Sequence, residues 1–202
     1  MQNFWSWQSL LVANAGLVLY GAVWAGGNCQ FPVLDEVETV PLEAGATAAA
    51  GSGGDIAGGR WELVHLRYAT SPFPIALSGQ AVGALEFDAS DSSSGTAGLA
   101  LQVTITSPSE EQIEEQGAGP YSAVGNQLSF ENDCGEETLL GDVEYDIDQS
   151  GDWPVMVLWG STSFDITSPF PATITILLQA EFELVDPQGV SDPIFEDRFE
   201  NP

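Results

Sequence analysis

The run from Asp146 to Asp152 carries the clearest arrangement of potential metal ligands in the chain. Asp146, Asp148 and Ser150 stand at alternate positions and are followed by a glycine and Asp152. Oxygen ligands at this spacing wrap a hard cation, and the glycine makes the sharp turn of a calcium loop. The twelfth position, where such a loop has a bidentate Glu, holds Val157. An Asp-rich turn between two strands is the ordinary alternative. The sequence therefore predicts no cofactor and keeps calcium on these four ligands as an open alternative.

Residue types that carry acid–base or nucleophilic catalysis are scarce. The chain has one histidine, His65, no lysine and no G-x-S-x-G motif, so a serine triad and a Schiff base lack their usual groups. Carboxylates are plentiful, but no spacing marks a glycosidase pair. Four of them, between Glu110 and Glu115, lie so close together that we interpret them as a solvated face. We therefore expect a protein that is not an enzyme.

The charge balance excludes several partners. Three Lys and Arg stand against thirty Asp and Glu in 202 residues, which gives a formal net charge of −27. Nucleic-acid binding needs basic side chains that neutralise phosphates, and an anionic membrane surface would repel this chain in the same way. The same charge favours a soluble monomer. The length suits one domain with appendages.

The amino end predicts export. Residues 10–25 form an apolar stretch too short for a membrane span, and it ends in small or apolar residues, as a cleaved signal peptide does. No Lys or Arg precedes it. We interpret residues 1–25 as a signal peptide and expect a periplasmic, cell-surface or extracellular protein. In such a compartment two cysteines predict a disulfide between Cys29 and Cys134, with two separate thiols as the alternative.

Three segments follow the signal. Residues 26–59 contain an irregular arm and a linker rich in Ala, Gly and Ser, which we expect to be flexible with nothing to bury. Residues 60–186 should form the folded domain, and residues 187–202 an acidic tail.

The domain is predicted to be all-β. Eight segments alternate apolar and polar residues or form short apolar runs between turn residues, which is typical of strands with one buried face. These segments are residues 61–68, 81–88, 99–106, 121–124, 127–131, 139–147, 155–159 and 173–185. In the first of them, simple alternation places His65 on the same side as Trp61, Leu63 and Arg67.

Two local signals lie between these strands. Residues 107–117 predict one short helix, because Ser107 suits its N-cap and Pro108 its first turn. Gly125 and Asn126 predict a hairpin turn, because both residue types tolerate a positive φ.

Two longer motifs carry a family resemblance. The run G-R-W-E-L-V begins at Gly59, and residues 119–134 read G-P-Y-S-A-V-G-N-Q-L-S-F-E-N-D-C. They resemble the opening strand and the G-x-Y-x-x-x-G-N-x-L-x-F hairpin of small exported lipocalin-like domains in bacteria, over about residues 59–186. The resemblance implies an antiparallel eight-stranded barrel, and a β-sandwich is the alternative. The tail resembles the I-F-x-D-G-F-E ending of many exported bacterial proteins, with Arg198 in place of Gly.

A barrel of this size can enclose a small apolar or amphipathic ligand. The motif T-S-P-F-P occurs twice, in loops that bring Phe73 and Phe170 toward one end, and we expect these two residues to contact a ligand together with Trp61, Tyr145 and Trp159. The leading hypothesis is an exported, non-enzymatic, lipocalin-like binding protein. The alternative is a structural or surface-associated protein whose barrel is filled by the side chains of Trp61, Tyr145, Trp153, Trp159 and Phe182.

Overall fold

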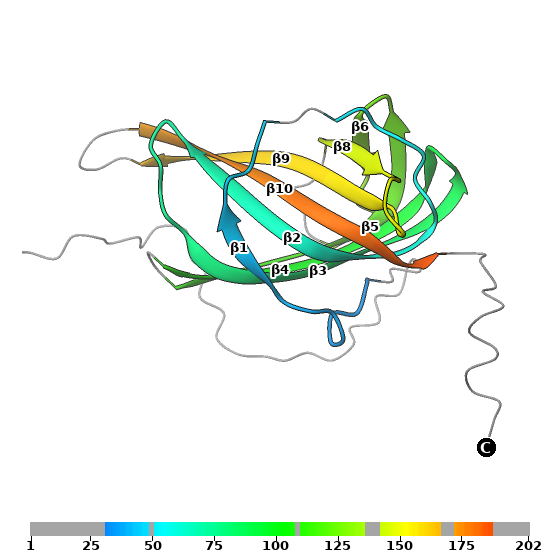
Figure 1. The fold of residues 1–202 in the computed structure, drawn as a ribbon, viewed down its shortest axis with the longest axis horizontal. Coiled ribbons are helices and arrows are strands. Elements are labelled where there is room, and N and C mark those ends of the chain that lie inside the picture. The colour runs from blue at the N-terminus through cyan, green and yellow to red at the C-terminus, as the bar shows by residue number, and fades with distance from the viewer. Residues whose placement is uncertain (1–30, 49–50, 108–109, 136–141, 167–171, 188–202) are drawn as a thin grey trace, which may run out of the picture.

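The structure is a computed structural model that describes residues 31–48, 51–107, 110–135, 142–166 and 172–187. In these residues the chain forms ten strands and no helix (Figure 1), which confirms the all-β class. The strands are β1 (Val40–Ala44), β2 (Gly59–Ser71), β3 (Ser78–Asp91), β4 (Ser94–Ser107), β5 (Glu111–Val124), β6 (Gln127–Phe130), β7 (Cys134–Gly135), β8 (Asp142–Asp148), β9 (Val155–Ile166) and β10 (Ala172–Pro187).

All ten strands belong to one sheet, and nine of them close into a ring. Strands β2, β3, β4, β5, β6, β8, β9 and β10 are antiparallel neighbours in that order, and β10 pairs back with β2. Strand β7 adds two residues to β5. The ring leaves the long strands with one face inward and one outward, as the alternating sequence requires.

The ninth strand of the ring, β1, comes from the segment before the expected domain. Strand β2 pairs with β3 only over its first four residues, after which the two separate. Strand β1 lies in the space between them, parallel to β2 with Leu42 opposite Leu66, and antiparallel to β3 with Val40 opposite Ala81. Because Val40 and Leu42 are buried, β1 contributes to the core as well as to the sheet.

The described parts of the Ala/Gly/Ser-rich segment, residues 45–48 and 51–58, contact β10 and β8, and we call these two stretches the strap. The Thr47 backbone N–H donates to Gln179 Oε1 of β10 at 3.1 Å, and the Gly53 N–H donates to the Tyr145 carbonyl of β8 at 3.1 Å. Ile56 then enters the core with 2 % of its surface exposed. The prediction of a flexible linker with nothing to bury is therefore wrong for the described part of this segment.

Glycine lets the strap approach the sheet closely. A Cβ on Gly51 would lie 2.3 Å from the Tyr145 carbonyl oxygen, and one on Gly53 would lie 2.0 Å from the Gly125 oxygen. Gly53 also has a φ of 76°, a conformation that L side chains rarely adopt. A composition that resembles a flexible linker thus serves close packing of backbone against backbone.

The predicted helix at residues 107–117 is wrong. Strand β5 occupies most of that range and pairs with β4 from Ile105 opposite Glu111 to Ser94 opposite Ser122. Capping signals are local and worth about 1 kcal/mol, whereas a long ladder satisfies the backbone of both strands and buries every second side chain. The predicted turn at Gly125 is confirmed, with a φ of 63° between β5 and β6.

The inner faces of the ring strands form the main core. Its fully buried members share an inward position and include Trp61, Leu63, Leu85, Phe87, Leu128, Val143, Met156, Leu158 and Phe182. On the outside, Leu34 and Val37 of the arm pack against Val82 and Ala84 of β3. The arm is therefore fastened to the sheet at this outer cluster.

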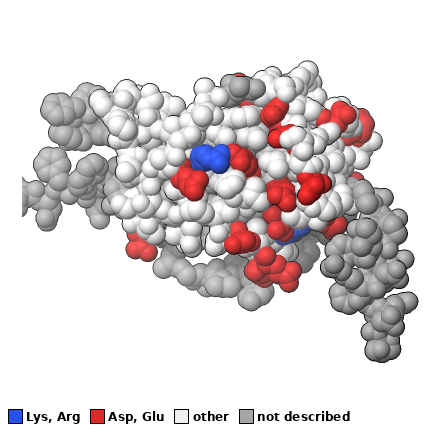
Figure 2. Space-filling model, viewed as in Figure 1, with Lys and Arg blue, Asp and Glu red and all other residues white. Residues whose placement is uncertain are grey.

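The two ends of the ring differ in charge. The end where β2 begins and where the β3–β4 and β5–β6 turns lie is named the acidic end here; the opposite end, where β2 ends and β10 begins, is the neutral end. Residues 68–80, 100–107 and 172–180, which form much of the neutral end, contain no charged side chain, whereas Glu110, Glu111 and Glu114 lie there at the start of β5 and Asp165 at the end of β9. In Figure 2 most of the visible acidic side chains lie over the right half of the molecule, and fewer lie over the left half.

Candidate functional site

The interior near the acidic end is filled by side chains, including two of the five predicted ligand contacts. Trp61 is fully buried and its Nε1–H donates to the Ala57 carbonyl at 3.2 Å. The Tyr145 hydroxyl donates to the Gly54 carbonyl at 2.8 Å, and burial raises its pKa above the usual value. Both aromatic residues thus use their polar atoms to hold the strap across this end.

The other predicted ligand contacts lie elsewhere. Trp159 on β9 is opposite Gln179 on the outer face of the sheet. Phe73 is 58 % exposed in the loop between β2 and β3, where Thr70 Oγ1 donates to the Phe73 carbonyl at 2.8 Å. Phe170 lies outside the described residues. The structure therefore brings Trp61 and Tyr145 together inside the ring and does not gather all five around one space; a role in ligand binding stays a prediction.

His65 does not share the inward side with Trp61. Glu181 is opposite His65 and Phe182 is opposite Leu63, so Val64 is an extra residue in β2. This bulge reverses the alternation, because one inserted residue shifts all later side chains to the other face. His65 is exposed on the outer face, where its cross-strand neighbour is Glu181.

The basic side chain nearest to His65 is committed to carboxylates. Arg67 Nη1 forms an ion pair with Glu181 Oε1, and its Nε lies 3.9 Å from Glu43 Oε2 of β1. These exposed pairs contribute little to stability individually. His65 and Arg67 therefore both lie beside carboxylates on the outer face of the sheet. Among the described residues of this region, neither points into a cleft.

The predicted calcium loop uses its oxygens for turn and strap contacts. Asp146 Oδ1 accepts from the Ser52 backbone N–H at 3.0 Å and from Ser52 Oγ at 2.6 Å. Asp148 Oδ1 accepts from the Ser150 N–H at 2.8 Å, and these hydrogen bonds to Ser150 lower the pKa of Asp148. In the described ranges no three His, Cys, Asp or Glu side chains are close enough to hold a metal ion. Calcium on Asp146, Asp148, Ser150 and Asp152 stays a prediction.

The structure describes only one of the two cysteines. Cys134 lies in β7 and is opposite Ala118 of β5. Cys29 lies outside the described residues, so the pairing of these two cysteines stays a prediction.

At the neutral end, inward-facing apolar side chains keep partial contact with water. On β4, Ala97 and Leu99 are buried near the acidic end, whereas Leu101, Val103 and Ile105 farther along the same inner face are half-buried. On the inner face of β10, Phe182 and Leu184 are buried and Ile176, Leu178 and Ala180 are half-buried, while Ile174, nearer the neutral end, is buried again. This group of half-buried inward side chains is the apolar candidate site.

A buried carboxylate borders that site. Glu115 of β5 is opposite Leu101, so it points inward, and only 7 % of its surface is exposed. The interpretation of residues 110–115 as one solvated face is wrong for Glu115. Successive side chains of a strand point to opposite faces. Glu114 therefore points outward, where its carboxylate accepts hydrogen bonds from Gln102 and Gln112.

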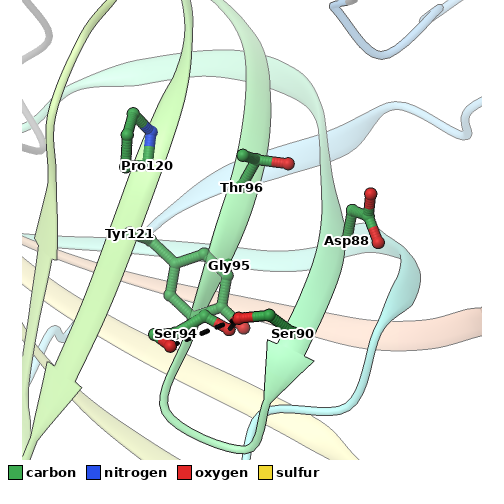
Figure 3. Close-up of a pocket in the computed structure, with 7 residues that line it drawn as sticks. All are labelled: Asp88, Ser90, Ser94, Gly95, Thr96, Pro120 and Tyr121. Atoms are coloured by element: carbon green, nitrogen blue, oxygen red, sulfur yellow. Dashed lines mark hydrogen bonds between the residues drawn. The ribbon is translucent and has the colours of Figure 1, made fainter.

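A second candidate site is a shallow polar hollow at the acidic end. Figure 3 shows it beside the β3–β4 turn, with a lining that consists of Asp88, Ser90, Ser94, Gly95, Thr96, Pro120 and Tyr121. Tyr121 is 3 % exposed, packs edge-on against Phe87 with ring centroids 5.0 Å apart, and its hydroxyl has no hydrogen-bond partner in the described part of the chain. Burial, with the nearby charges of Asp91 and Asp88, raises the pKa of Tyr121 to about 12.

No family model, curated protein or solved structure matches this chain. In the described ranges the structure contains no helix that is long and apolar enough to cross a membrane. The geometry of the two candidate sites therefore carries the functional argument.

Proposed function

We propose that the chain is an exported, non-enzymatic binding protein that takes a small uncharged apolar or amphipathic molecule at the neutral end of its ring. One observation carries the proposal: six inward apolar side chains of β4 and β10 are half-buried toward the neutral end, beside Tyr68, Ala81 and Ile174, which are buried. Half-buried apolar surface facing inward gains free energy when an apolar ligand covers it, at about 25 cal/mol per Å².

The charge distribution supports an uncharged ligand group. At the neutral end residues 68–80 and 100–107 carry no charge, and the charged residues at the start of β5, Glu110, Glu111 and Glu114, are acidic. The carboxylates at the start of β5 and the buried Glu115 disfavour an anionic ligand group. An amphipathic ligand would therefore place its apolar part on Leu101 and Leu178 and keep any anionic group away.

The finer fold proposal is a lipocalin-like barrel. Two observations support it: eight strands of the ring are sequential neighbours from β2 to β10 without a crossover, and a hairpin turn at Gly125 joins β5 to β6. Strand β1 departs from that expectation because it is a ninth, partly parallel member of the ring. The eight-stranded barrel is therefore proposed for β2 to β10, with β1 inserted between β2 and β3.

The compartment and assembly state are proposals from the sequence. Export rests on the apolar residues 10–25, and a monomer rests on self-repulsion at a net charge of −27. The proposed Cys29–Cys134 bridge would tie the N-terminal arm to β7. Intact mass of the secreted protein, with and without reduction and thiol labelling, tests signal cleavage and the bridge together; two labelled thiols without reduction would exclude the bridge.

Ligand binding is tested by placing a large side chain in the interior at the neutral end. A fluorescent fatty-acyl probe is titrated into the full chain, into Leu101→Trp and into Gln102→Trp. Leu101 points inward and Gln102 is its outward neighbour, so both variants add the same side chain to the same strand. We expect the inward Trp to weaken probe binding at least about tenfold, because it occupies the apolar surface, and the outward one to change it less than about twofold.

A second function is favoured if the probe does not bind. The acidic half of the interior is already filled by Trp61, Phe87 and Phe182, and a structural or surface-associated protein needs no free interior. Absence of probe binding by the unmodified chain, or equal weakening in both variants, would contradict the binding proposal and favour this second function.

A further inference from the structure

The first half of β5 forms an edge of the sheet. Residues 111–116 pair with β4 on one side. On the other side β6 covers residues 121–124 of β5, and the two residues of β7 cover Gly117 and Ala118. No strand that the structure describes lies along residues 111–116 on that side, and we call this row of backbone groups the β5 edge.

The β5 edge has the regular geometry that a further strand needs. Its six residues pair with β4 one by one, from Glu111 opposite Ile105 to Gln116 opposite Ala100, and they include no Pro and no Gly. In an antiparallel pair, successive residues direct their N–H and C=O groups alternately toward the two sides of the strand. About half of these backbone groups therefore point away from β4, and such a row is a template for pairing with another chain.

The charge beside the β5 edge has one sign. Residues 110–116 contain four Glu and no Lys or Arg, and Glu110 and Glu114 are exposed. Like charges on neighbouring strands oppose pairing, whereas opposite charges favour it. A second copy of this chain, with its net charge of −27, is therefore a poor occupant, and a basic strand is the complementary one.

The two faces of β5 set the side-chain pattern of such a strand. Ile113 is opposite Val103, so it points inward, and it is half-buried. Gln112 and Glu114 point outward and are exposed. The side chains of an added strand would alternate between the same two faces. Apolar residues at its inward positions would cover Ile113, and basic residues at its outward positions would reach Glu114.

We propose that the β5 edge is an interaction surface that takes an extended basic segment of another protein as an added strand. The backbone of residues 111–116 supplies the hydrogen bonds, as in other cases of strand addition. Glu114 and the neighbouring carboxylates select Lys or Arg and reject acidic strands. The surface differs from the apolar candidate site, because the added strand lies in the wall of the ring and not in its interior.

The test is amide hydrogen exchange of the ¹⁵N-labelled full chain, with and without a short blocked peptide of alternating Val and Lys. We expect the peptide to slow exchange at least about tenfold at those amides of residues 111–116 that point away from β4, because pairing gives them hydrogen bonds. The same peptide with every backbone amide N-methylated keeps its charge but cannot pair. A peptide of alternating Val and Glu keeps the strand pattern and reverses the charge. Neither control should slow exchange there.

Two variants of the chain make the same charge change at different places. Glu114 lies beside the β5 edge, whereas Glu183 lies on β10, which β6, β8 and β9 separate from β5. Glu114→Gln should weaken binding of the Val and Lys peptide by about twofold to fivefold, the value of an exposed ion pair. Glu183→Gln should weaken it by less than about 1.5-fold in about 0.15 M KCl, which screens distant charges.

Several results would overturn the proposal. Equal slowing by the N-methylated peptide, or equal weakening by the two variants, would mean attraction between charges without an added strand. Slowing confined to residues 160–166 of β9, which pair only with β10 among the described strands, would place strand addition at that edge. Slow exchange throughout residues 111–116 without peptide would mean that the β5 edge is already paired, with a second copy if the slowing increases with protein concentration and within the chain if it does not.

Discussion

The same strands build both ends of the ring, yet the two ends use their inward side chains differently. Near the acidic end, Trp61 and Phe182 are buried and the strap residue Ile56 closes the core. Near the neutral end, Leu101 and Leu178 face the same interior and stay half-buried. The difference shows that closure of a β ring does not by itself fill its interior, because a further segment of chain has to supply the side chains that cover the end.

Charge follows the same division. The acidic side chains described by the structure gather toward the sealed end, where strap, turns and strand ends meet (Figure 2). At that end Arg60 bridges Glu62 and Glu86 at 2.8 and 2.9 Å, and its Nη2 donates to the Val33 carbonyl of the arm at 2.6 Å. Most charged side chains thus lie in one half of the molecule, and the other half has long uncharged stretches with carboxylates at the start of β5.

The largest expected effect on stability comes from removing one aromatic side chain from the core at the acidic end. Trp61→Ala should lower the free energy of unfolding by about 3–5 kcal/mol, because it removes a fully buried ring and the bond to Ala57. Trp153, 47 % exposed, is the matched control, and Trp153→Ala should cost about 1 kcal/mol or less. Urea unfolding followed by circular dichroism measures both, and equal losses would contradict a filled acidic end.

A second pair compares the two ends with one type of substitution. Leu63→Ala near the acidic end should lower the free energy of unfolding by about 3 kcal/mol, since Leu63 is 2 % exposed. Leu101→Ala near the neutral end should lower it by about 1–2 kcal/mol, because that side chain is partly exposed to water. A cost for Leu101 as large as that for Leu63 would mean that the neutral end is packed as tightly as the acidic one.

The third prediction tests the strap. Gly53→Ala should lower the free energy of unfolding by about 2–3 kcal/mol, because the new Cβ would meet the Gly125 oxygen at 2.0 Å. Gly125→Ala is the control: its φ of 63° is also positive, but nothing lies within 4 Å of its Cβ, so we expect a cost of about 1 kcal/mol. If both variants cost the same, the strap does not pack closely against the β5–β6 turn.

The smallest effect appears only at alkaline pH. Tyr121 has a pKa of about 12 in the fold against a usual value of 10.0, so its contribution to stability is complete below pH 10 and is lost as the pH rises from 10 toward 12. Tyr121→Phe should lose less stability over that interval and should change little at pH 7. Absorbance titration of tyrosinate is the direct measurement; if all four tyrosines ionise together near pH 10, the buried phenol is absent.

Much of the fold was predictable because its patterns are short-range. Alternation in residues 99–106 and 173–185 marked β4 and β10, and the turn at Gly125 marked the β5–β6 hairpin. The candidate sites were much less predictable. Of the five predicted ligand contacts, Trp61 and Tyr145 fill the interior and Trp159 faces outward, because the face on which an aromatic side chain lies depends on register rather than on residue type.

The polar hollow had only a weak signal in the sequence. Asp88, Ser90 and Asp91 read as turn residues, and nothing local shows that Tyr121, about thirty positions later, ends beside them without a partner. The half-buried Leu101 and Leu178 read as ordinary core positions. In both places what matters is how much of a side chain is exposed to solvent. That exposure depends on neighbours that are far away in the sequence.

By itself the sequence determined the all-β class, the excess of negative charge and the division into charged and uncharged stretches, since composition and period-two alternation are properties of neighbouring residues. Only the tertiary structure decided that residues 111–117 extend β5, that Val64 reverses the faces of β2, and that β1 and Ile56 belong to the sheet and core. Each of these depends on pairing with a distant strand, whose ladder and buried area outweigh local capping and linker preferences.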